Sequence, residues 1–237
     1  MMAAIRSALF ALLFYPGTLV YVLSVIAVSP LGSRPVRAVV HGWSNYHHFL
    51  VRYVLGIRMV FEGFIPPGPY LIAMKHQAMV ETVEALRLAD TPVVVMKREL
   101  TVMPLFGWVT RRYGVIGVDR EAGAKALREM LAAGKAAVAD GRPVVIFPEG
   151  TRIPVGERPK LRAGFAGLYR ALGLPVVPVA LNSGLFWGRR SFHKLPGRIV
   201  VEFLTPIPPG LERREFMTEL ETAIETAANR LAAMSIH

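Results

Sequence analysis

The sequence has 237 residues, 53% of them hydrophobic, and its 28 Lys and Arg against 17 Asp and Glu give a net charge of +11. This length suits one α/β domain with or without an appendage, and the apolar, basic composition favours an anionic membrane surface over a nucleic acid as partner. Zinc-finger, RNP-type and basic-zipper patterns are absent, and the lack of cysteine excludes disulfides, thiol nucleophiles and cysteine metal sites.

The N-terminal part of the chain is predicted to anchor the protein in a membrane. The segment Ala8–Val28 carries no charged residue and is just long enough to cross a hydrocarbon core of about 30 Å. Pro16-Gly17 interrupts it, which permits either a kinked span or a re-entrant segment. A cleaved signal peptide is the alternative, but the apolar run is long for a signal and no clear cleavage site follows. The arginines after the segment predict that its C-terminal side is cytoplasmic.

A second helix is predicted over Arg34–Leu55, ended by Gly56 as a C-cap. Its aromatic, histidine and arginine side chains favour a helix that lies in the membrane interface. The histidines His41, His47 and His48 raise the alternative of a metal site, but the interfacial composition explains them better, so no metal site is predicted. We therefore expect residues 1–56 to form membrane-anchoring helices and residues 57–237 to form an α/β domain.

After Ile57, short apolar runs alternate with helical segments. Continuous apolar strands are buried on both faces, which predicts a mixed, largely parallel sheet flanked by helices. Pro178 lies inside one run, which predicts an edge strand or a bulge there. The predicted strands are Tyr70–Met74, Val93–Met96, Tyr113–Val118, Pro143–Phe147, Pro175–Leu181 and Ile199–Phe203, and the predicted helices are Ala78–Ala89, Ala122–Asp140, Ala163–Leu172 and Leu211–Ala233.

A histidine stands between the first of these strands and its helix, in Lys75-His76-Gln77-Ala78-Met79-Val80-Glu81. Histidine at such a turn can be partly exposed, titrate near neutral pH and touch a substrate. Inside one helix, His76 and Glu81 would lie about 140° apart. They can meet only if His76 lies in the turn and Glu81 in the first helical turn, where a carboxylate is favoured. Taken alone, the stretch fits a capping or surface histidine equally well.

Three further strand ends carry groups suited to a phosphate, at the edge where open α/β sheets bind ligands. Lys97 with Arg98 ends one strand, and Asp119-Arg120 ends another, where an Asp can pre-align an Arg whose planar fork matches phosphate. The most specific stretch is Phe147-Pro148-Glu149-Gly150-Thr151-Arg152. There Gly150 lets the backbone approach a ligand, and its neighbours offer an acceptor, a hydroxyl and a cation.

The C-terminal half of the chain is strongly basic. Between Arg142 and Arg198 there are ten Lys or Arg against two Glu and no Asp, a net charge of +8. A solvated surface would explain this excess. A face held against anionic lipid, or one that steers an anionic substrate, explains it better.

The order of these motifs resembles the glycerolipid acyltransferase family, in particular 1-acyl-glycerol-3-phosphate acyltransferases. The resemblance covers roughly residues 58–204. It implies a membrane-bound α/β enzyme that moves an acyl chain from acyl-CoA or acyl carrier protein to the hydroxyl of a lysophospholipid. The acceptor that the resemblance favours is 1-acyl-sn-glycerol-3-phosphate, which would give phosphatidic acid as the product. The motifs that carry it are His76-x4-Glu81, Gly114…Asp119-Arg120, Phe147-Pro148-Glu149-Gly150-Thr151-Arg152 and Val177-Pro178-Val179.

The same resemblance assigns roles to single residues. His76 would be the general base, with Glu81 as its partner, since a hydroxyl that attacks a thioester needs a base near neutral pKa. The acyl group passes directly, so no protein nucleophile, metal or cofactor is needed, and no G-x-S-x-G elbow is present. The family usually has Asp at Glu81 and Phe at Gly117, which leaves the acceptor open. The residues that would bind the acceptor's glycerol phosphate are Lys97, Arg120, Glu149, Gly150, Thr151 and Arg152.

Two other functions stay open. The chain could be a non-catalytic membrane protein that binds lipid with the same fold, for which the Glu81 departure is the only support. The intact His76 and the complete stretch from Phe147 to Arg152 argue against it. The chain could also be a hydrolase that uses His76 and Glu81 on bound water, which turnover of acyl-CoA without an acceptor would reveal.

Overall fold

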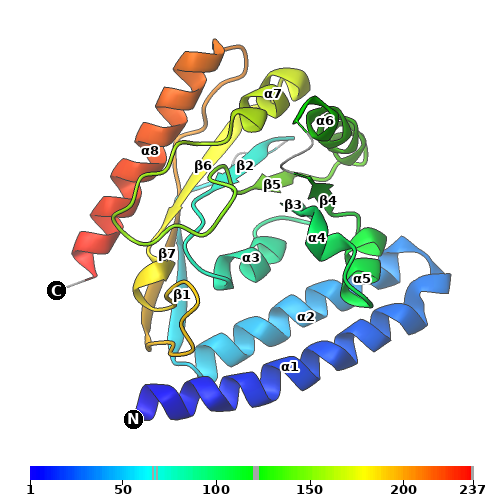
Figure 1. Ribbon diagram of the computed structural model, residues 1–237, viewed down its shortest axis with the longest axis vertical. Coiled ribbons are helices and arrows are strands. Elements are labelled where there is room, and N and C mark those ends of the chain that lie inside the picture. Colours follow the sequence, from blue (N-terminus) through cyan, green and yellow to red (C-terminus); the bar gives the residue numbers. More distant parts are fainter. Residues whose placement is uncertain (66, 68, 120–122, 236–237) are drawn as a thin grey trace.

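A seven-stranded sheet forms the centre of the molecule (Figure 1), in a computed structural model that describes residues 1–65, 67, 69–119 and 123–235. Its strands are β1 (Ile57–Glu62), β2 (Leu71–Met74), β3 (Val93–Lys97), β4 (Ile116–Val118), β5 (Val144–Ile146), β6 (Val176–Leu181) and β7 (Gly197–Phe203). Their order is β1-β7-β6-β2-β5-β3-β4, and the pairs are parallel except β6 with β7. The predicted mixed, largely parallel α/β fold is therefore confirmed.

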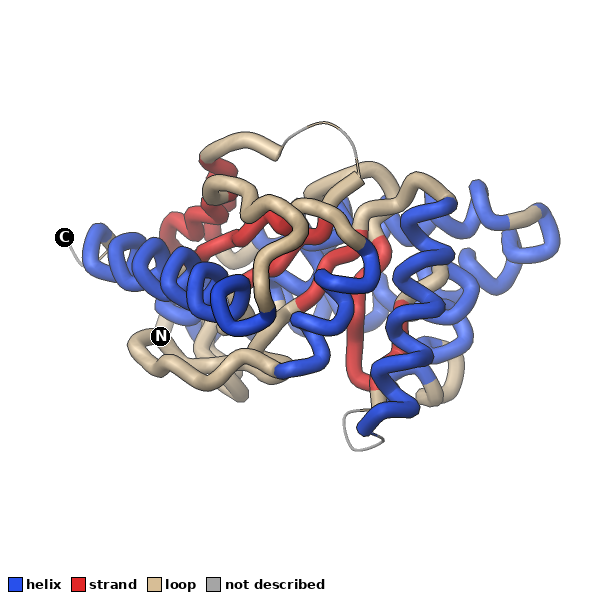
Figure 2. Tube along the Cα trace, turned by 90° about the horizontal axis from the view of Figure 1, so that it is seen from above, coloured by secondary structure: helices blue, strands red, loops and turns tan. Residues whose placement is uncertain are grey.

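Helices cover both faces of this sheet, and in Figure 2, seen from above, the strands run through the middle of the molecule with helices around them. The longer helices are α1 (Met2–Val28), α2 (Ser33–Tyr53), α5 (Phe106–Tyr113), α6 (Gly123–Ala139), α7 (Ala163–Leu172) and α8 (Arg213–Met234), and the short ones are η1 (Ser29–Leu31), α3 (Val80–Glu84), η2 (Ala85–Arg87), α4 (Arg98–Thr101) and η3 (Ser183–Leu185).

The strands are continuously apolar because each face of the sheet packs against a different helical layer. In β2, Ile72 and Met74 join the core beneath α1, α2, α3 and α5. Leu71 and Ala73, which alternate with them, join the core beneath α6, α7 and α8. Phe216, near the start of α8, is fully buried there.

Three strand predictions need correction. The pattern of apolar runs misses β1, because Arg58 and Glu62 interrupt it; β1 lies at the sheet edge, where such residues reach solvent. Tyr113 ends α5 instead of beginning a strand, because Gly114 follows in the left-handed region at φ +93° and closes the helix. Pro178 lies in the interior strand β6, not at an edge, but the register shifts by one residue between Val176↔Ile207 and Val179↔Phe203, as the bulge alternative predicts.

The register of β6 explains how a central strand accepts Pro178. On the β7 side, Val176 donates a hydrogen bond to the carbonyl of Ile207, and pairing with β7 begins only at Val179. Pro178 falls between these two pairings, and its carbonyl still accepts the Leu204 N–H at 2.9 Å. The missing N–H of proline therefore coincides with a gap in the ladder.

The N-terminal helices form an antiparallel pair along one side of the domain (Figure 1). Helix α1 continues through Pro16, so the chain does not turn back there as a re-entrant segment would. Gly17 has a different role: a Cβ there would lie 2.4 Å from the Tyr46 ring, so glycine lets α1 and α2 approach closely. The Tyr46 hydroxyl donates to the carbonyl of Leu13 at 2.8 Å, which joins the two helices.

Helix α2 packs between α1 and the α/β domain, while Phe49 and Tyr53 near its C-terminal end stay exposed. Val36, Val40 and Leu50 are buried in that contact. Its histidines have protein partners, since His47 and His48 both place Nδ1 near the carboxylate of Glu84. Among the described residues, no group of three or more His, Cys, Asp or Glu is arranged to hold a metal.

Candidate active site

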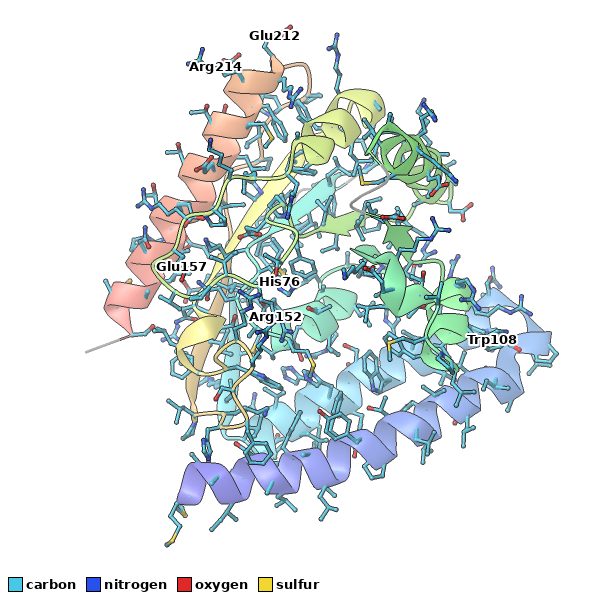
Figure 3. All side chains as sticks on the ribbon, in the orientation of Figure 1. His76, Trp108, Arg152, Glu157, Glu212 and Arg214 are labelled. Carbon is cyan, nitrogen blue, oxygen red and sulfur yellow. The ribbon has the colours of Figure 1, made fainter. Side chains whose placement is uncertain are left out.

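His76 lies in the turn between β2 and α3, with its side chain 15% exposed (Figure 3). Nδ1 is 3.1 Å from Oε1 of Glu81, and the other ring nitrogen, Nε2, makes no hydrogen bond to a described residue. The imidazole packs against the Phe147 ring at a centroid distance of 4.3 Å. The ring is therefore held in place by two contacts while one nitrogen stays available.

The carboxylate of Glu81 is buried and surrounded by donors. Oε1 also accepts the backbone N–H groups of Gln77 at 2.6 Å and Ala78 at 2.5 Å, and Oε2 accepts the Ser183 hydroxyl at 2.9 Å. All of these neighbours are donors, so the Glu81 carboxylate acts only as an acceptor. Nδ1 of His76 must therefore carry the proton of its hydrogen bond to Glu81. The lone pair of Nε2 is then free to accept a proton from a substrate. Helix α3 begins at Val80, so the turn-and-helix placement that the spacing requires is what the structure has.

Arg152 lies next to the histidine in Figure 3. The neighbouring Ile153 donates its N–H to the His76 carbonyl at 2.8 Å, which fixes the loop after β5 against the turn after β2. Arg152 is partly exposed and makes no ion pair with a described residue. Gly150 turns the chain at φ +70°, with its N–H donating to the Phe147 carbonyl, and Thr151 follows with partial exposure.

The other predicted cations are placed less closely. Lys97 ends β3, and β5 lies between β3 and β2, so the strands of Lys97 and His76 are about 10 Å apart. The ammonium of Lys97 pairs with Glu99 at 2.5 Å, and both side chains are half exposed. Arg120 lies outside the described residues. The structure thus brings together His76, Glu81 and Arg152, with Lys97 farther along the same edge.

Glu149 does not lie where an acceptor could touch it. Its side chain is fully buried, and Oε1 accepts the backbone N–H of His76 at 3.3 Å. Oε2 has no hydrogen-bond partner among the described residues. Burial raises the pKa of this carboxyl to about 7, against the opposing charge of Lys75. The direct contact with the acceptor that we predicted is therefore not supported, because the side chain turns back beneath the sheet edge.

A buried ion pair beneath the site was not predicted at all. Lys75 is 1% exposed, and its ammonium contacts Glu225 of α8 and lies 3.8 Å from Oε1 of Glu149. The sequence gives no signal for Glu225, which lies in the middle of a helix whose pattern indicates only that it packs against the core. Ser183 was not among the predicted site residues either. It lies just after the carboxyl end of β6, and polar residues at the carboxyl ends of other strands are the ones that we predicted as candidates.

A second buried carboxylate connects α2 to α3. Glu84 accepts hydrogen bonds from Nδ1 of His47 and His48 and from Arg87 at 2.9 Å. Burial opposes ionisation, but the two histidines outweigh it and hold the pKa of Glu84 at about 2. For His47, burial disfavours the protonated, charged form and so lowers the pKa. This pairing fixes α3, which carries Glu81, against the N-terminal helices.

An apolar cavity of about 90 Å³ lies between the N-terminal helices and the sheet. Val25 and Trp43 line it from α1 and α2, and Val83, Leu86 and Val94 line it from the domain. Thr82, immediately after Glu81, is also part of its wall. The cavity offers apolar surface of the kind that suits a hydrocarbon chain.

Comparison with known proteins gives the family. The family model described as Acyltransferase matches residues 56–182. A 1-acyl-sn-glycerol-3-phosphate acyltransferase of Pseudomonas aeruginosa is 38% identical over 84% of this chain and 79% of that protein. The alpha form from Bos taurus is 28% identical over 67% of this chain and 57% of that protein. The crystal structure of PlsC, the 1-acyl-sn-glycerophosphate acyltransferase of Thermotoga maritima, has the same fold, with a TM-score of 0.78 at 21% identity over 98% of both chains. The chain belongs to the acyltransferase family.

Proposed function

We propose that the protein transfers a fatty acyl chain from acyl-CoA or acyl carrier protein to the free hydroxyl of 1-acyl-sn-glycerol-3-phosphate, giving phosphatidic acid. The observation that carries the proposal is His76, with Nδ1 held by Glu81 and Nε2 free at the site. The relatives named above, which are 1-acyl-sn-glycerol-3-phosphate acyltransferases, support this choice of acceptor.

The reaction follows from the two ring nitrogens. The acceptor hydroxyl donates its hydrogen bond to Nε2, and as its oxygen attacks the thioester carbonyl, the new C–O bond forms and the proton moves to His76. The tetrahedral intermediate then breaks its C–S bond, and the imidazolium returns the proton to the leaving thiolate. The carboxylate of Glu81 stabilises the imidazolium between these steps. This route uses no protein nucleophile, cofactor or metal.

The acceptor phosphate would bind beside His76. Arg152 supplies a partly exposed guanidinium next to the histidine, whose fork matches a phosphate. Thr151 and the backbone at Gly150 add a hydroxyl and a close approach, and Lys97 extends the cationic edge. Arg120 stays a predicted contact of the phosphate. Glu149 acts from below as a positioning residue, through its contact with the His76 N–H.

We further propose that residues 1–56 attach residues 57–237 to the cytoplasmic side of a membrane. In the part of the chain that the structure describes, one helical stretch, Met2–Leu31, is long and apolar enough to cross a membrane. Its outer face is exposed and apolar, while α2 and the domain pack along its other side (Figure 1). A helix packed in this way fits best in the membrane surface, with its outer face in one leaflet.

The activity is tested with purified full-length protein in mixed micelles, acyl-CoA or acyl carrier protein thioester, and a panel of lysophospholipids. Mass spectrometry should find phosphatidic acid from 1-acyl-sn-glycerol-3-phosphate, formed about 10²- to 10⁴-fold more slowly with His76→Ala. Free fatty acid without acceptor would indicate a hydrolase instead. A folded protein that binds lysolipid but forms no product with either donor would contradict catalysis.

The attachment is tested by washing membranes that contain the full-length protein. We expect the protein to stay with the membrane in high salt and to need detergent, because apolar contacts are not screened by ions. Release of active protein by salt alone would contradict the anchor and leave the +11 charge as the whole attachment.

A further inference from the structure

The chain between η3 and β7 makes a closed surface loop, residues 188–196. Trp187 and Lys194 form an antiparallel bridge across its base. Beside that bridge, the Leu195 N–H donates to the Phe186 carbonyl at 2.8 Å. These two contacts close the loop.

A buried lysine holds this surface loop to α1. Lys194 is 8% exposed, and its backbone N–H donates to the Ser7 hydroxyl at 2.9 Å. Its ammonium lies 4.8 Å from the centre of the Trp187 ring and 5.8 Å from that of Phe10. Ser7 and Phe10 are on the buried face of α1. The loop is thus fixed to the N-terminal end of the apolar helix.

The side chains that this loop exposes are of two kinds. Phe192 and Leu195 are 53% and 49% exposed, although both are large and apolar. Arg189 and Arg190 are exposed next to them and make no ion pair with a described residue. Arg190 adopts φ +60°, a left-handed conformation that is uncommon outside glycine. Arginines beside an exposed aromatic ring fit the interface of an anionic bilayer, where guanidinium binds phosphate and the ring enters the headgroup layer.

We propose that the surface loop is a second membrane contact, specific for anionic lipid. The proposal rests on the proposed attachment of α1, whose exposed face begins with Met2, Ile5 and Leu9 at the same end of the helix. A single helix in a membrane surface leaves the domain free to rotate about the helix axis. A contact to one side of that axis removes this freedom and sets how the open edge with His76 faces the bilayer.

Because the native chain has no cysteine, single cysteines can be labelled at chosen positions. A fluorophore sensitive to polarity is attached at Leu195→Cys in the loop, at Leu12→Cys on the exposed face of α1, and at Glu212→Cys, which lies at the far end of the molecule (Figure 3). The full-length protein is placed in vesicles of phosphatidylcholine alone or with phosphatidylglycerol. Emission and quenching by aqueous iodide report whether each position touches lipid.

We expect the label at position 12 to be shielded from iodide in both vesicles and the label at 212 in neither. The label at 195 should be shielded with phosphatidylglycerol and much less without it. The double variant Arg189→Gln/Arg190→Gln should shift the loop from lipid to water about 30-fold, which equals about 2 kcal/mol for two charges. The control Arg213→Gln/Arg214→Gln removes the same charge beside position 212 and should change nothing.

Each contrary outcome has a distinct meaning. A label at 195 as accessible as that at 212, with position 12 shielded, would refute the loop contact and leave the α1 attachment intact. Accessible labels at both 12 and 195 would refute the attachment and the loop contact together. Equal shielding at 195 in neutral and anionic vesicles, or equal effects of the two double variants, would refute recognition of anionic lipid by the loop.

Discussion

Removal of the charge of Glu225 should destabilise the protein strongly, although this residue lies on α8, outside the region that the family model matches. The ammonium of Lys75 is buried and contacts Glu225 directly, and the next carboxylate, Glu149, has Oε1 3.8 Å away. Breaking a buried pair by removing one partner typically costs about 3–5 kcal/mol. Glu149 should compensate in part, since two charges at that separation attract by about 4 kcal/mol at an effective dielectric constant of 20.

We therefore expect Glu225→Gln to lower the free energy of unfolding by about 3 kcal/mol, the lower end of that range. This equals roughly a hundredfold change in the unfolding equilibrium. Without Glu225, a like charge that raises the pKa of Glu149 is gone, so that pKa should fall and Glu149 should become the main partner of Lys75. Because Glu149 also accepts the His76 N–H, the folded variant should lose part of its kcat as well.

The assay is denaturant unfolding of full-length protein in detergent at pH 8, followed by tryptophan fluorescence. Glu219→Gln on the exposed side of the same helix is the matched control and should lie within about 0.5 kcal/mol of the native protein. The double variant Lys75→Met/Glu225→Leu should recover part of the loss, since a buried pair can be replaced by apolar groups at little cost, while Glu149 loses its counter-charge. A native unfolding midpoint for Glu225→Gln, or a double variant no more stable than Glu225→Leu alone, would refute the reasoning.

The other predictions concern the site and its support. His76→Ala should lose about two to four decades of kcat with acyl donor still bound, and near-native turnover of the folded variant would exclude His76 as the base. Glu81→Asp should lower kcat in part, because the shorter side chain lengthens the contact to His76. Glu81→Gln should lower kcat more than Glu81→Asp and less than His76→Ala, and pH–rate profiles of each variant check this order. Arg152→Ala should lower kcat/KM about ten- to hundredfold for a phosphate-bearing acceptor, while an equal loss on an acceptor without phosphate would remove it from phosphate recognition. Glu84 has a folded pKa of about 2, below its usual 4.5, so it contributes about 3 kcal/mol above pH 4.5 that is lost as the pH falls toward 2. Unfolding of Glu84→Gln should therefore differ from the native protein at pH 7 and approach it toward pH 3, and a difference that does not change with pH would contradict this.

The local sequence determined most of the sheet and the position of the histidine. A continuous apolar run such as Leu71–Met74 predicts a strand covered on both faces, and all four residues are buried. The spacing of His76 and Glu81 allowed contact only across a strand-to-helix turn, and β2 and α3 provide it. The positive charge around Arg189 and Arg190 can also be read from the sequence. The contacts that hold this loop against α1 cannot.

The tertiary structure decided what each buried polar group contacts. Glu149 stands in the most specific motif, but only the fold turns it away from the site toward Lys75. Glu225 and Ser183 reach the site from α8 and the end of β6, far along the chain from His76. Hydrophobic periodicity is a property of neighbouring residues and can be read locally. The partner of a buried charge depends on which distant elements meet across the core, and that is fixed only when the whole chain has folded.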